Sequence, residues 1–156
     1  MGWLIRHRKR FNTVASMSVN QAAKDGRRAV VAILQQKSNV LVIQRSKLVL
    51  APGKICFPGG MVEPGETLER ALIREMQEEL KLDIQPLKQV WQNHSPWGVE
   101  LFWWQVIHHP AQTITCNPQE VAWARWISWQ ELRESTNLLA TNIEFLQALD
   151  AGDILL

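Results

Sequence analysis

The 156-residue chain is long enough to fold as one domain with a sizeable core, in which roughly 70% of the unfolded surface would be buried. Its 46% hydrophobic and 21% charged residues, with a net charge of +2, are ordinary for a soluble globular protein, and no apolar run approaches the ~18 residues of a membrane span. A transmembrane protein is therefore excluded. Cys56 and Cys116 are too few for a disulfide framework and lack the paired spacing of a zinc site, so we expect free thiols in a reducing cytoplasm.

The positive charge is concentrated near the start of the chain. Residues 1–24 contain five basic side chains and no acidic one, so the remaining 132 residues hold 12 basic and 15 acidic side chains, a net charge of −3. We therefore treat residues 1–24 as a basic N-terminal extension and residues 25–156 as one domain. Two interpretations of the extension stay open: a disordered or partly docked segment, or an arm that binds nucleic acid or a membrane surface.

Two strands joined by a tight turn are expected at the start of the domain. Arg28–Leu34 and Asn39–Arg45 are rich in β-branched residues and are separated by the polar sequence QQKS, which is typical of a β-hairpin. Ile55–Phe57 is a short apolar segment that leads into Pro58–Gly60, and Pro64–Gly65 breaks the chain again. We expect a structured loop around these breaks.

A helix from Thr67, its N-cap, to about Leu80 follows the loop. Further strands are expected at Leu87–Trp91, Glu100–His108 and Val121–Ile127, and Ser128 and Asn142 are expected as N-caps of two later helices. Because strands and helices mix without strict βαβ alternation, we expect an α/β fold with a mixed sheet and helices on both faces.

The first of these helices has an apolar face and an acidic face. At about 100° per residue, most of its apolar side chains fall on one side, and Glu75, Glu78 and Glu79 fall on the opposite side. Like charges at i,i+3 and i,i+4 destabilise a helix by roughly 0.2–0.5 kcal/mol per pair, so a compensating group is expected. Clustered carboxylates on a rigid element are typical ligands of Mg²⁺ or Mn²⁺. A solvated acidic surface is the alternative.

The segment around these glutamates resembles the Nudix box, G-x5-E-x7-R-E-U-x-E-E-x-G-U, in which U is an apolar residue. The matching residues of this chain are Gly60, Glu66, Arg74, Glu75, Met76, Glu78, Glu79 and Leu82. Lys81 replaces the family glycine at the helix end. A lysine adopts positive φ at a cost of about 1 kcal/mol, so we expect altered helix termination with retained activity. The resemblance covers roughly residues 28–135.

The resemblance implies a Nudix-type α/β/α sandwich and a hydrolase that uses Mg²⁺ or Mn²⁺ to cleave the diphosphate of a nucleoside diphosphate linked to another group, X. It implies that Glu75, Glu78 and Glu79 are metal ligands and catalytic residues. Glu120, in the sequence NPQEV, is our candidate for a further catalytic carboxylate, with a solvent-exposed loop acid as the alternative. The general base would be one of these four glutamates.

Other residues are expected to support this site. The resemblance implies that Glu66 and Arg74 brace the loop against the helix, so Arg74 is expected to be structural. Gly59 and Gly60 allow backbone geometry and a close approach that a side chain would block. The Gly60 carbonyl is a candidate metal ligand.

The substrate is indicated only by two partial similarities. QRSKLVLAPGKICFPGG resembles in part a motif of coenzyme A diphosphatases, although an arginine is missing and the spacing is one residue short. HSPWGVE resembles a loop of ADP-ribose hydrolases, in which Trp97 would stack on a base. We expect Arg45 and Trp97 to bind substrate. The alternatives are a surface salt bridge for Arg45 and a turn residue that covers the core for Trp97.

Three other functions stay open at this stage. They are hydrolysis of nucleoside triphosphates such as 8-oxo-dGTP, hydrolysis of RNA ends with docking through residues 1–24, and a non-catalytic Nudix-fold binding module. The expected partner is a nucleotide-derived small molecule, and a homodimer and a nucleic acid are open alternatives. We expect a cytoplasmic protein without a membrane span.

Overall fold

The described part of the chain begins with a β-hairpin. The structure, a computed structural model, describes residues 26–156, so our expectations about residues 1–24 lie outside the described residues. Strands β1 (Arg28–Gln36) and β2 (Asn39–Arg45) pair antiparallel, and Lys37 adopts a left-handed conformation (φ 56°) in the turn that joins them. The hairpin that the sequence predicts is confirmed.

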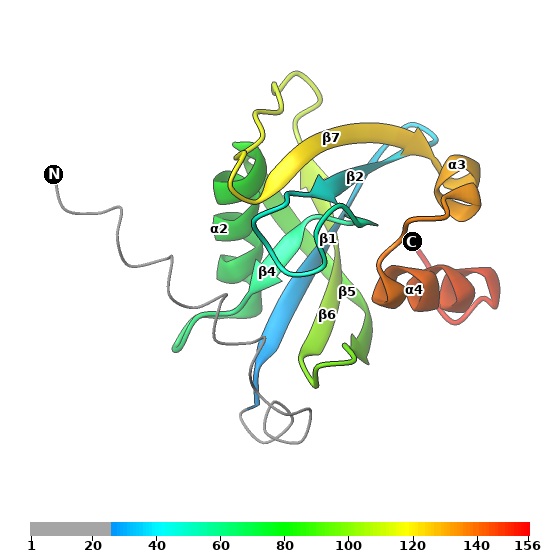
Figure 1. Cartoon of the computed structure of the whole chain (residues 1–156), viewed down its shortest axis with the longest axis horizontal. Coiled ribbons are helices and arrows are strands. Elements are labelled where there is room, and N and C mark those ends of the chain that lie inside the picture. Colours follow the sequence, from blue (N-terminus) through cyan, green and yellow to red (C-terminus); the bar gives the residue numbers. More distant parts are fainter. Residues whose placement is uncertain (1–25) are drawn as a thin grey trace, which may run out of the picture.

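Seven strands of residues 26–156 form a mixed sheet (Figure 1). Besides β1 and β2 they are β3 (Ile55–Cys56), β4 (Gly59–Met61), β5 (Ile84–His94), β6 (Glu100–His108) and β7 (Val121–Ser128). The central path runs β3-β2-β1-β6-β5, with β4 also paired to β1 and β7 also paired to β2. β1 and β6 are parallel, and the other pairs are antiparallel.

Helices cover both faces of the sheet (Figure 1). They are α2 (Leu68–Leu80), α3 (Trp129–Glu134) and α4 (Ala140–Asp150). On one face Leu72 and Met76 of α2 are buried against the strands. On the other face Trp103 of β6 stacks on Phe145 of α4, with ring centroids 4.5 Å apart. The predicted α/β fold, with a mixed sheet between helices, is confirmed.

Two expectations from composition also have an outcome. Cys56 and Cys116 are free thiols, as expected. Burial raises the pKa of Cys56 to about 11, as befits a core residue. Within residues 26–156, the helices are all too short or too polar to cross a membrane.

Two elements differ from the sequence prediction. Gly59–Met61, expected within a loop, is strand β4, because its backbone pairs antiparallel with β1. α4 begins at Ala140, and Asn142 lies buried within its first turn. The Asn142 Oδ1 accepts a hydrogen bond from the Phe57 N–H (2.8 Å). This side chain therefore provides a partner for a backbone N–H between β3 and β4 and does not cap its own helix. The prediction that Asn142 is an N-cap is therefore wrong.

α2 ends in the way that a glycine would end it. Lys81 adopts the left-handed conformation (φ 57°, ψ 34°), and the N–H groups of Lys81 and Leu82 donate to the carbonyls of Gln77 and Met76, each at 3.2 Å. Leu82 is buried, and this apolar contact accompanies the helix end. The expected altered helix termination is wrong, because the lysine takes on the strained conformation and the helix stops at Leu80.

A β-bulge sets the course of β7 where this strand begins. Gln44 is opposite Trp123, but Arg45 is opposite Val121, so Ala122 is an extra residue. As a result Val121 packs on the α2 side of the sheet, whereas Trp123 packs on the α4 side. The chain just before Val121 is thereby directed differently from the rest of the strand.

Candidate active site

The buried face of α2 sets the direction of its carboxylates. Four apolar side chains of the helix are fully buried, which fixes the rotation of the helix about its axis. Glu75 and Glu79, one turn apart, are only 7% and 5% exposed. The Glu79 carboxylate accepts a hydrogen bond from the Gly59 N–H (3.1 Å), so this side chain reaches β4. Two of the predicted metal ligands are thus directed inward.

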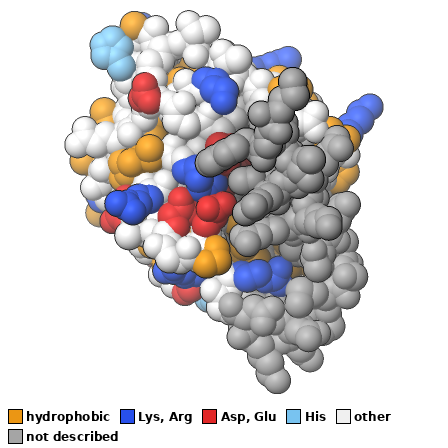
Figure 2. Space-filling model, turned by 90° about the vertical axis from the view of Figure 1, so that its left-hand side faces the viewer, with side chains coloured by type: hydrophobic (Ala, Val, Ile, Leu, Met, Phe, Trp, Pro, Cys, Tyr) orange, Lys and Arg blue, Asp and Glu red, His pale blue; other side chains and the backbone are white. Residues whose placement is uncertain are grey.

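Three carboxylates meet beside β4. One oxygen atom from each of Glu75, Glu79 and Glu120 lies within 4.8 Å of the other two. We call these three residues the carboxylate cluster. Figure 2 shows acidic side chains gathered on the α2 side of the molecule, with Lys or Arg side chains close by.

The loop before β7, which carries Glu120, is fastened to the C-terminal end of α2. The N–H groups of Thr115 and Asn117 donate to the carbonyls of Leu80 and Glu79 (2.9 and 2.8 Å). These are carbonyls that a helix end leaves without partners inside the helix. A short turn follows, in which the Glu120 N–H donates to the Asn117 carbonyl (3.0 Å). The helix end therefore helps to hold the third carboxylate near the other two.

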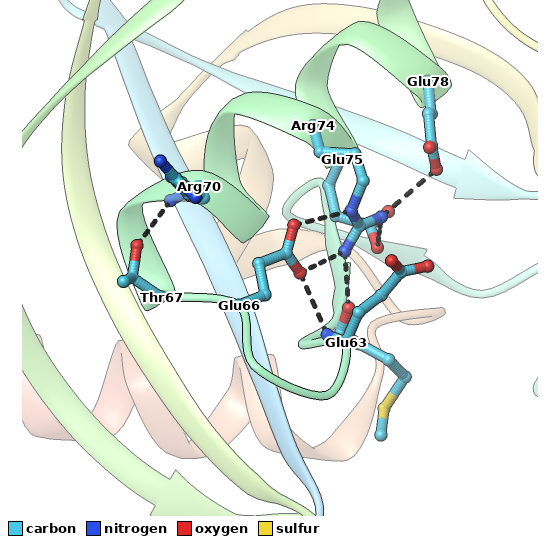
Figure 3. A network of polar contacts seen from close by, with 8 residues as sticks. Glu63, Glu66, Thr67, Arg70, Arg74, Glu75 and Glu78 are labelled. Atoms are coloured by element: carbon cyan, nitrogen blue, oxygen red, sulfur yellow. Dashed lines mark hydrogen bonds and ion pairs between the residues drawn. The ribbon is translucent and has the colours of Figure 1, made fainter.

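Arg74 ties the loop before α2 to the acidic face of this helix (Figure 3). Its Nε and Nη2 atoms donate to the two carboxylate oxygens of Glu66 (2.8 and 2.9 Å), and Nη2 also donates to the Met61 carbonyl (2.8 Å). Its Nη1 atom donates to Glu75 (2.8 Å) and Glu78 (3.2 Å). One guanidinium group thus connects β4, the loop and the helix through its planar array of donors.

Two glycines make room for this arrangement. A Cβ atom on Gly60 would lie 2.3 Å from the carboxylate carbon of Glu75, and a Cβ atom on Gly59 would lie 2.0 Å from the Val30 carbonyl oxygen. Both distances are far shorter than a van der Waals contact. β4 can therefore pass this close to α2 and β1 only because it carries no side chain at these two positions.

Burial opposes the ionisation of the cluster. Removal from water raises the pKa of Glu75 to about 7, although the neighbouring Arg74 acts in the opposite direction. Burial also raises the pKa of Glu79 well above its ordinary value, and the charges of Glu75 and Glu120 raise it further. Hydrogen bonds from Arg74 lower the pKa of Glu66. Negative charge in the cluster is thus unfavourable unless a positive charge is added.

The chemistry of these donors fits a hard divalent cation. The three carboxylates offer oxygen atoms, which Mg²⁺ and Mn²⁺ prefer as ligands. Their close spacing would let Glu75, Glu79 and Glu120 contact one ion, and its charge would offset the unfavourable burial of theirs.

Comparison with known families decides which family this site belongs to. The model of the NUDIX domain matches residues 25–149. The chain belongs to the Nudix family. The family resemblance that the sequence shows around residues 60–82 is thereby confirmed, and the match extends over most of the chain.

The curated relatives of this Nudix chain are named for different substrates. It is 31% identical over 94 residues to the NAD-capped RNA hydrolase NudC of Stutzerimonas stutzeri (strain A1501). It is 45% identical over 56 residues to an ADP-ribose pyrophosphatase of Methanocaldococcus jannaschii. It is 41% identical over 56 residues to an 8-oxo-dGTP diphosphatase of Proteus vulgaris. These matches cover 60%, 35% and 36% of this chain and 34%, 31% and 50% of the respective relatives. The chain therefore matches a third to a half of the length of these relatives.

Solved structures share the Nudix fold. The MutT protein from Methanosarcina mazei Go1 is 23% identical with a TM-score of 0.70, and the match covers 81% of this chain and 94% of that one. The ORF135 protein of E. coli is 25% identical with a TM-score of 0.64, and the match covers 80% and 89% of the two chains. Both support the fold described above.

The structure brings together only part of the acidic face that the sequence predicts for this Nudix chain. Glu75 and Glu79 lie in the cluster, and Glu120 joins them from its loop. The side chain of Glu78 is 37% exposed and binds Arg74, so it lies at the edge of the site. Gly60 lies against Glu75, where its carbonyl stays a candidate metal ligand.

The two residues expected to bind substrate lie in different places. Arg45 ends β2 opposite Val121, and its Nε donates to the Leu50 carbonyl (2.7 Å). Its charge acts against the effect of burial on the pKa of Glu79, so Arg45 is close to the cluster. Trp97 lies in the turn between β5 and β6, at the lower end of the molecule in Figure 1, whereas α2 and the start of β7 lie higher.

Sequence reasoning missed Ser46. This serine follows the last residue of β2 and is buried, with hydrogen bonds to the backbone of Gln119 and Glu120. A serine directly after a strand is ordinary in sequence, and its contacts depend on a segment more than 70 residues away. No pattern in the sequence indicated that Ser46 would form hydrogen bonds to the carbonyls of Gln119 and Glu120.

Proposed function

We propose that this Nudix chain is a divalent-metal-dependent hydrolase, and that it cleaves a nucleoside diphosphate linked to X into a nucleoside monophosphate and X-phosphate. The observation that supports this most directly is the carboxylate cluster, in which three side chains from α2 and a distant loop bring oxygen atoms within 4.8 Å of one another. Membership of the Nudix family supports hydrolysis over simple binding, since the matched relatives are named as hydrolases and diphosphatases.

The carboxylate cluster and its neighbours would hold Mg²⁺ or Mn²⁺. Glu75, Glu79 and Glu120 would be carboxylate ligands, and the Gly60 carbonyl and the Glu78 carboxylate at the edge of the site are further candidates. When bound, such an ion neutralises charge on phosphoryl oxygens and makes a water molecule more acidic. Arg74 keeps the Glu75 side chain in place through its Nη1, and Glu66 anchors Arg74 to the loop. These two residues act as support for the ligands.

Two further roles fall to residues around the cluster. A carboxylate must accept a proton from the attacking water, and the four glutamates of the site are the candidates. Glu78 and Glu120 are both partly exposed, so either of them can exchange protons with solvent. Arg45 is the candidate to bind a phosphate group, because its guanidinium is held by the Leu50 carbonyl at the end of β2, near the cluster.

The names of the relatives support a diphosphate linkage as the bond that is cut. NAD and ADP-ribose each contain a diphosphate between a nucleoside and a second group, and relatives named for them are 31% and 45% identical over the matched segments. The second candidate function is hydrolysis of nucleoside triphosphates, which the relatives named 8-oxo-dGTP diphosphatase favour. Both classes offer adjacent phosphates, which a phosphate monoester lacks.

A hydrolysis panel tests the proposal. ADP-ribose, coenzyme A, NAD, 8-oxo-dGTP and nitrophenyl phosphate are incubated with the full chain and Mg²⁺ or Mn²⁺, and products are separated by chromatography. We expect a nucleoside monophosphate and X-phosphate from ADP-ribose and NAD. From coenzyme A, whose ribose carries a further phosphate, we expect adenosine 3′,5′-bisphosphate and X-phosphate. Pyrophosphate released from triphosphates much faster than any diphosphate derivative is cut would favour the second candidate, and orthophosphate from nitrophenyl phosphate would reject both. A cytoplasmic location stays a prediction, and a homodimer and nucleic-acid binding through residues 1–24 stay open alternatives.

A further inference from the structure

Ser46 is a buried polar residue with no role in the proposed chemistry. It lies directly after β2 and is only 4% exposed. Its Oγ donates to the Gln119 carbonyl (2.8 Å) and accepts from the Leu48 N–H (3.1 Å), and its own N–H donates to the Glu120 carbonyl (2.9 Å). Ser46 therefore holds two consecutive carbonyl groups, and the second belongs to a member of the carboxylate cluster.

The hydrogen bonds from Ser46 to the Gln119 and Glu120 carbonyls act on the one carboxylate of the cluster that comes from a loop. The other two carboxylates sit on a helix whose buried face fixes them. Glu120 comes from a loop, which the Asn117 N–H fastens to the Glu79 carbonyl on one side (2.8 Å). On the other side the bulge at Ala122 interrupts the regular pairing of β7 with β2. Ser46 is thus the place where the β2 side of the sheet holds the loop.

We propose that Ser46 is a positioning residue for Glu120, which fixes the backbone of Gln119 and Glu120 so that the Glu120 carboxylate completes the cation site. The proposal rests on the proposed function in one respect, because it assumes that the cluster binds a divalent cation. Without the hydroxyl, the Gln119 carbonyl and the Leu48 N–H would each lose a partner in a partly buried place beside the buried Ser46 side chain. The loop would then shift or admit water, and Glu120 would move away from the other ligands.

Binding of Mn²⁺ to the full chain tests this role without any substrate. Free Mn²⁺ is measured by electron paramagnetic resonance during a titration. Ser46→Ala is expected to weaken Mn²⁺ binding by about 10-fold, because loss of a group that orients a ligand lowers metal affinity by roughly 10–100-fold. Ser46→Thr, which keeps the hydroxyl, is expected to retain most of the affinity.

Ser128→Ala is the matched control. The Ser128 hydroxyl also accepts a hydrogen bond from a backbone N–H, that of Glu131 (3.1 Å), but it lies at the opposite end of β7 and caps α3. Its removal is expected to destabilise the fold, as loss of an N-cap does, and to leave Mn²⁺ affinity within about twofold of wild type. The control therefore separates a general loss of stability from a local effect on the site.

A double-mutant cycle shows whether Ser46 acts through Glu120. In the Glu120→Gln background, Ser46→Ala is expected to weaken Mn²⁺ binding by less than about twofold, since the ligand that it positions is already lost. A further tenfold loss in that background, or wild-type affinity in Ser46→Ala alone, would overturn the proposal. If Ser46→Ala does not fold, Ser46→Cys, which is slightly larger than serine and only a weak donor, takes its place in the same cycle.

The outcomes also separate this proposal from the proposed function. If wild type binds Mn²⁺ and hydrolyses nothing in the panel, the proposed function fails, and the binding data alone decide the role of Ser46. If wild type does not bind Mn²⁺, both proposals are overturned.

Discussion

In the absence of divalent cations, the fold is expected to lose stability as the pH rises through the range in which the carboxylate cluster ionises. Burial raises the pKa of Glu75 from 4.5 to about 7. Below about pH 4.5 this carboxyl is protonated in both the folded and the unfolded chain. Between about pH 4.5 and 7 only the unfolded chain has released the proton, so the free energy of unfolding falls as the pH rises. Above about pH 7 both states are ionised, and the free energy of unfolding levels off. At about 1.4 kcal/mol per pH unit, Glu75 alone accounts for a loss of about 3 kcal/mol.

Urea unfolding followed by circular dichroism near pH 5 and near pH 8, with EDTA or with Mn²⁺, measures this loss. Added Mn²⁺ is expected to restore stability near pH 8 and to have little effect near pH 5, where fewer ligands are ionised. Glu79→Gln removes one buried charge and can still accept the hydrogen bond from Gly59. In EDTA near pH 8 it is therefore expected to be more stable than wild type, because burial disfavours the charged form of Glu79. Glu134→Gln, the same change at an exposed position of α3, is the control and is expected to follow wild type.

Other titrating groups act outside this range or in the opposite sense. Hydrogen bonds from Arg74 lower the pKa of Glu66, so the stability from this pair is fully present above about pH 4.5 and is lost only at lower pH. Burial lowers the pKa of His108, so its contribution rises as the pH approaches 6.5. The difference between wild type and Glu79→Gln cancels both effects. Equal stability of wild type near pH 5 and pH 8 in EDTA, without a gain from Glu79→Gln, would refute the reasoning.

Four further predictions concern the metal, Gly60, the two candidate substrate-binding residues and Lys81. Chelation is expected to abolish hydrolysis, and Glu79→Gln to lower kcat by at least about 100-fold with an unchanged circular dichroism spectrum; full activity in excess EDTA would contradict the metal assignment. Gly60→Ala is expected to weaken Mn²⁺ binding at least about 10-fold, since its Cβ would lie 2.3 Å from a ligand carboxylate, and wild-type binding would show that β4 can move aside. Arg45→Ala and Trp97→Ala are each expected to raise KM more than they lower kcat. The rise in KM is expected to be larger for Arg45→Ala, because Arg45 lies near the cluster. A lower kcat at unchanged KM would argue against ground-state binding. Lys81→Gly is expected to raise the free energy of unfolding by about 0.5 kcal/mol with unchanged activity, because glycine adopts this left-handed conformation freely; a less stable variant would contradict the strain at this position.

The parts of the site that lie on α2 could be predicted because helical periodicity places residues without help from the rest of the fold. Thr67 starts the helix as expected, and the acidic face follows from counting at 100° per residue. The spacing from Gly60 to Glu66 and Arg74 likewise concerns neighbours in sequence. The fold class was predictable for the same reason, since local patterns indicate which segments are strands and which are helices.

The parts that depend on distant segments could not be derived in the same way. Whether Glu120 meets α2 depends on the bulge at Ala122 and on hydrogen bonds from the loop to the helix end. Asn142 is of a residue type that is common at N-caps, but its side chain accepts a hydrogen bond from the Phe57 N–H, which lies in the distant connection between β3 and β4. β4 is a strand only because β1 lies beside it, and its glycines suggest a loop when they are considered alone.

The pairing of β2 with β7 also bears on when the protein becomes active during its synthesis. β7 closes onto a strand made much earlier in the chain, and contacts between residues so distant in sequence form slowly compared with a helix. A growing chain that has emerged from the ribosome only as far as α2 holds Glu75 and Glu79 without their third partner. If the proposed function holds, such a chain would not yet bind Mn²⁺ tightly, and the proposed hydrolysis would begin only when the last strand takes its place.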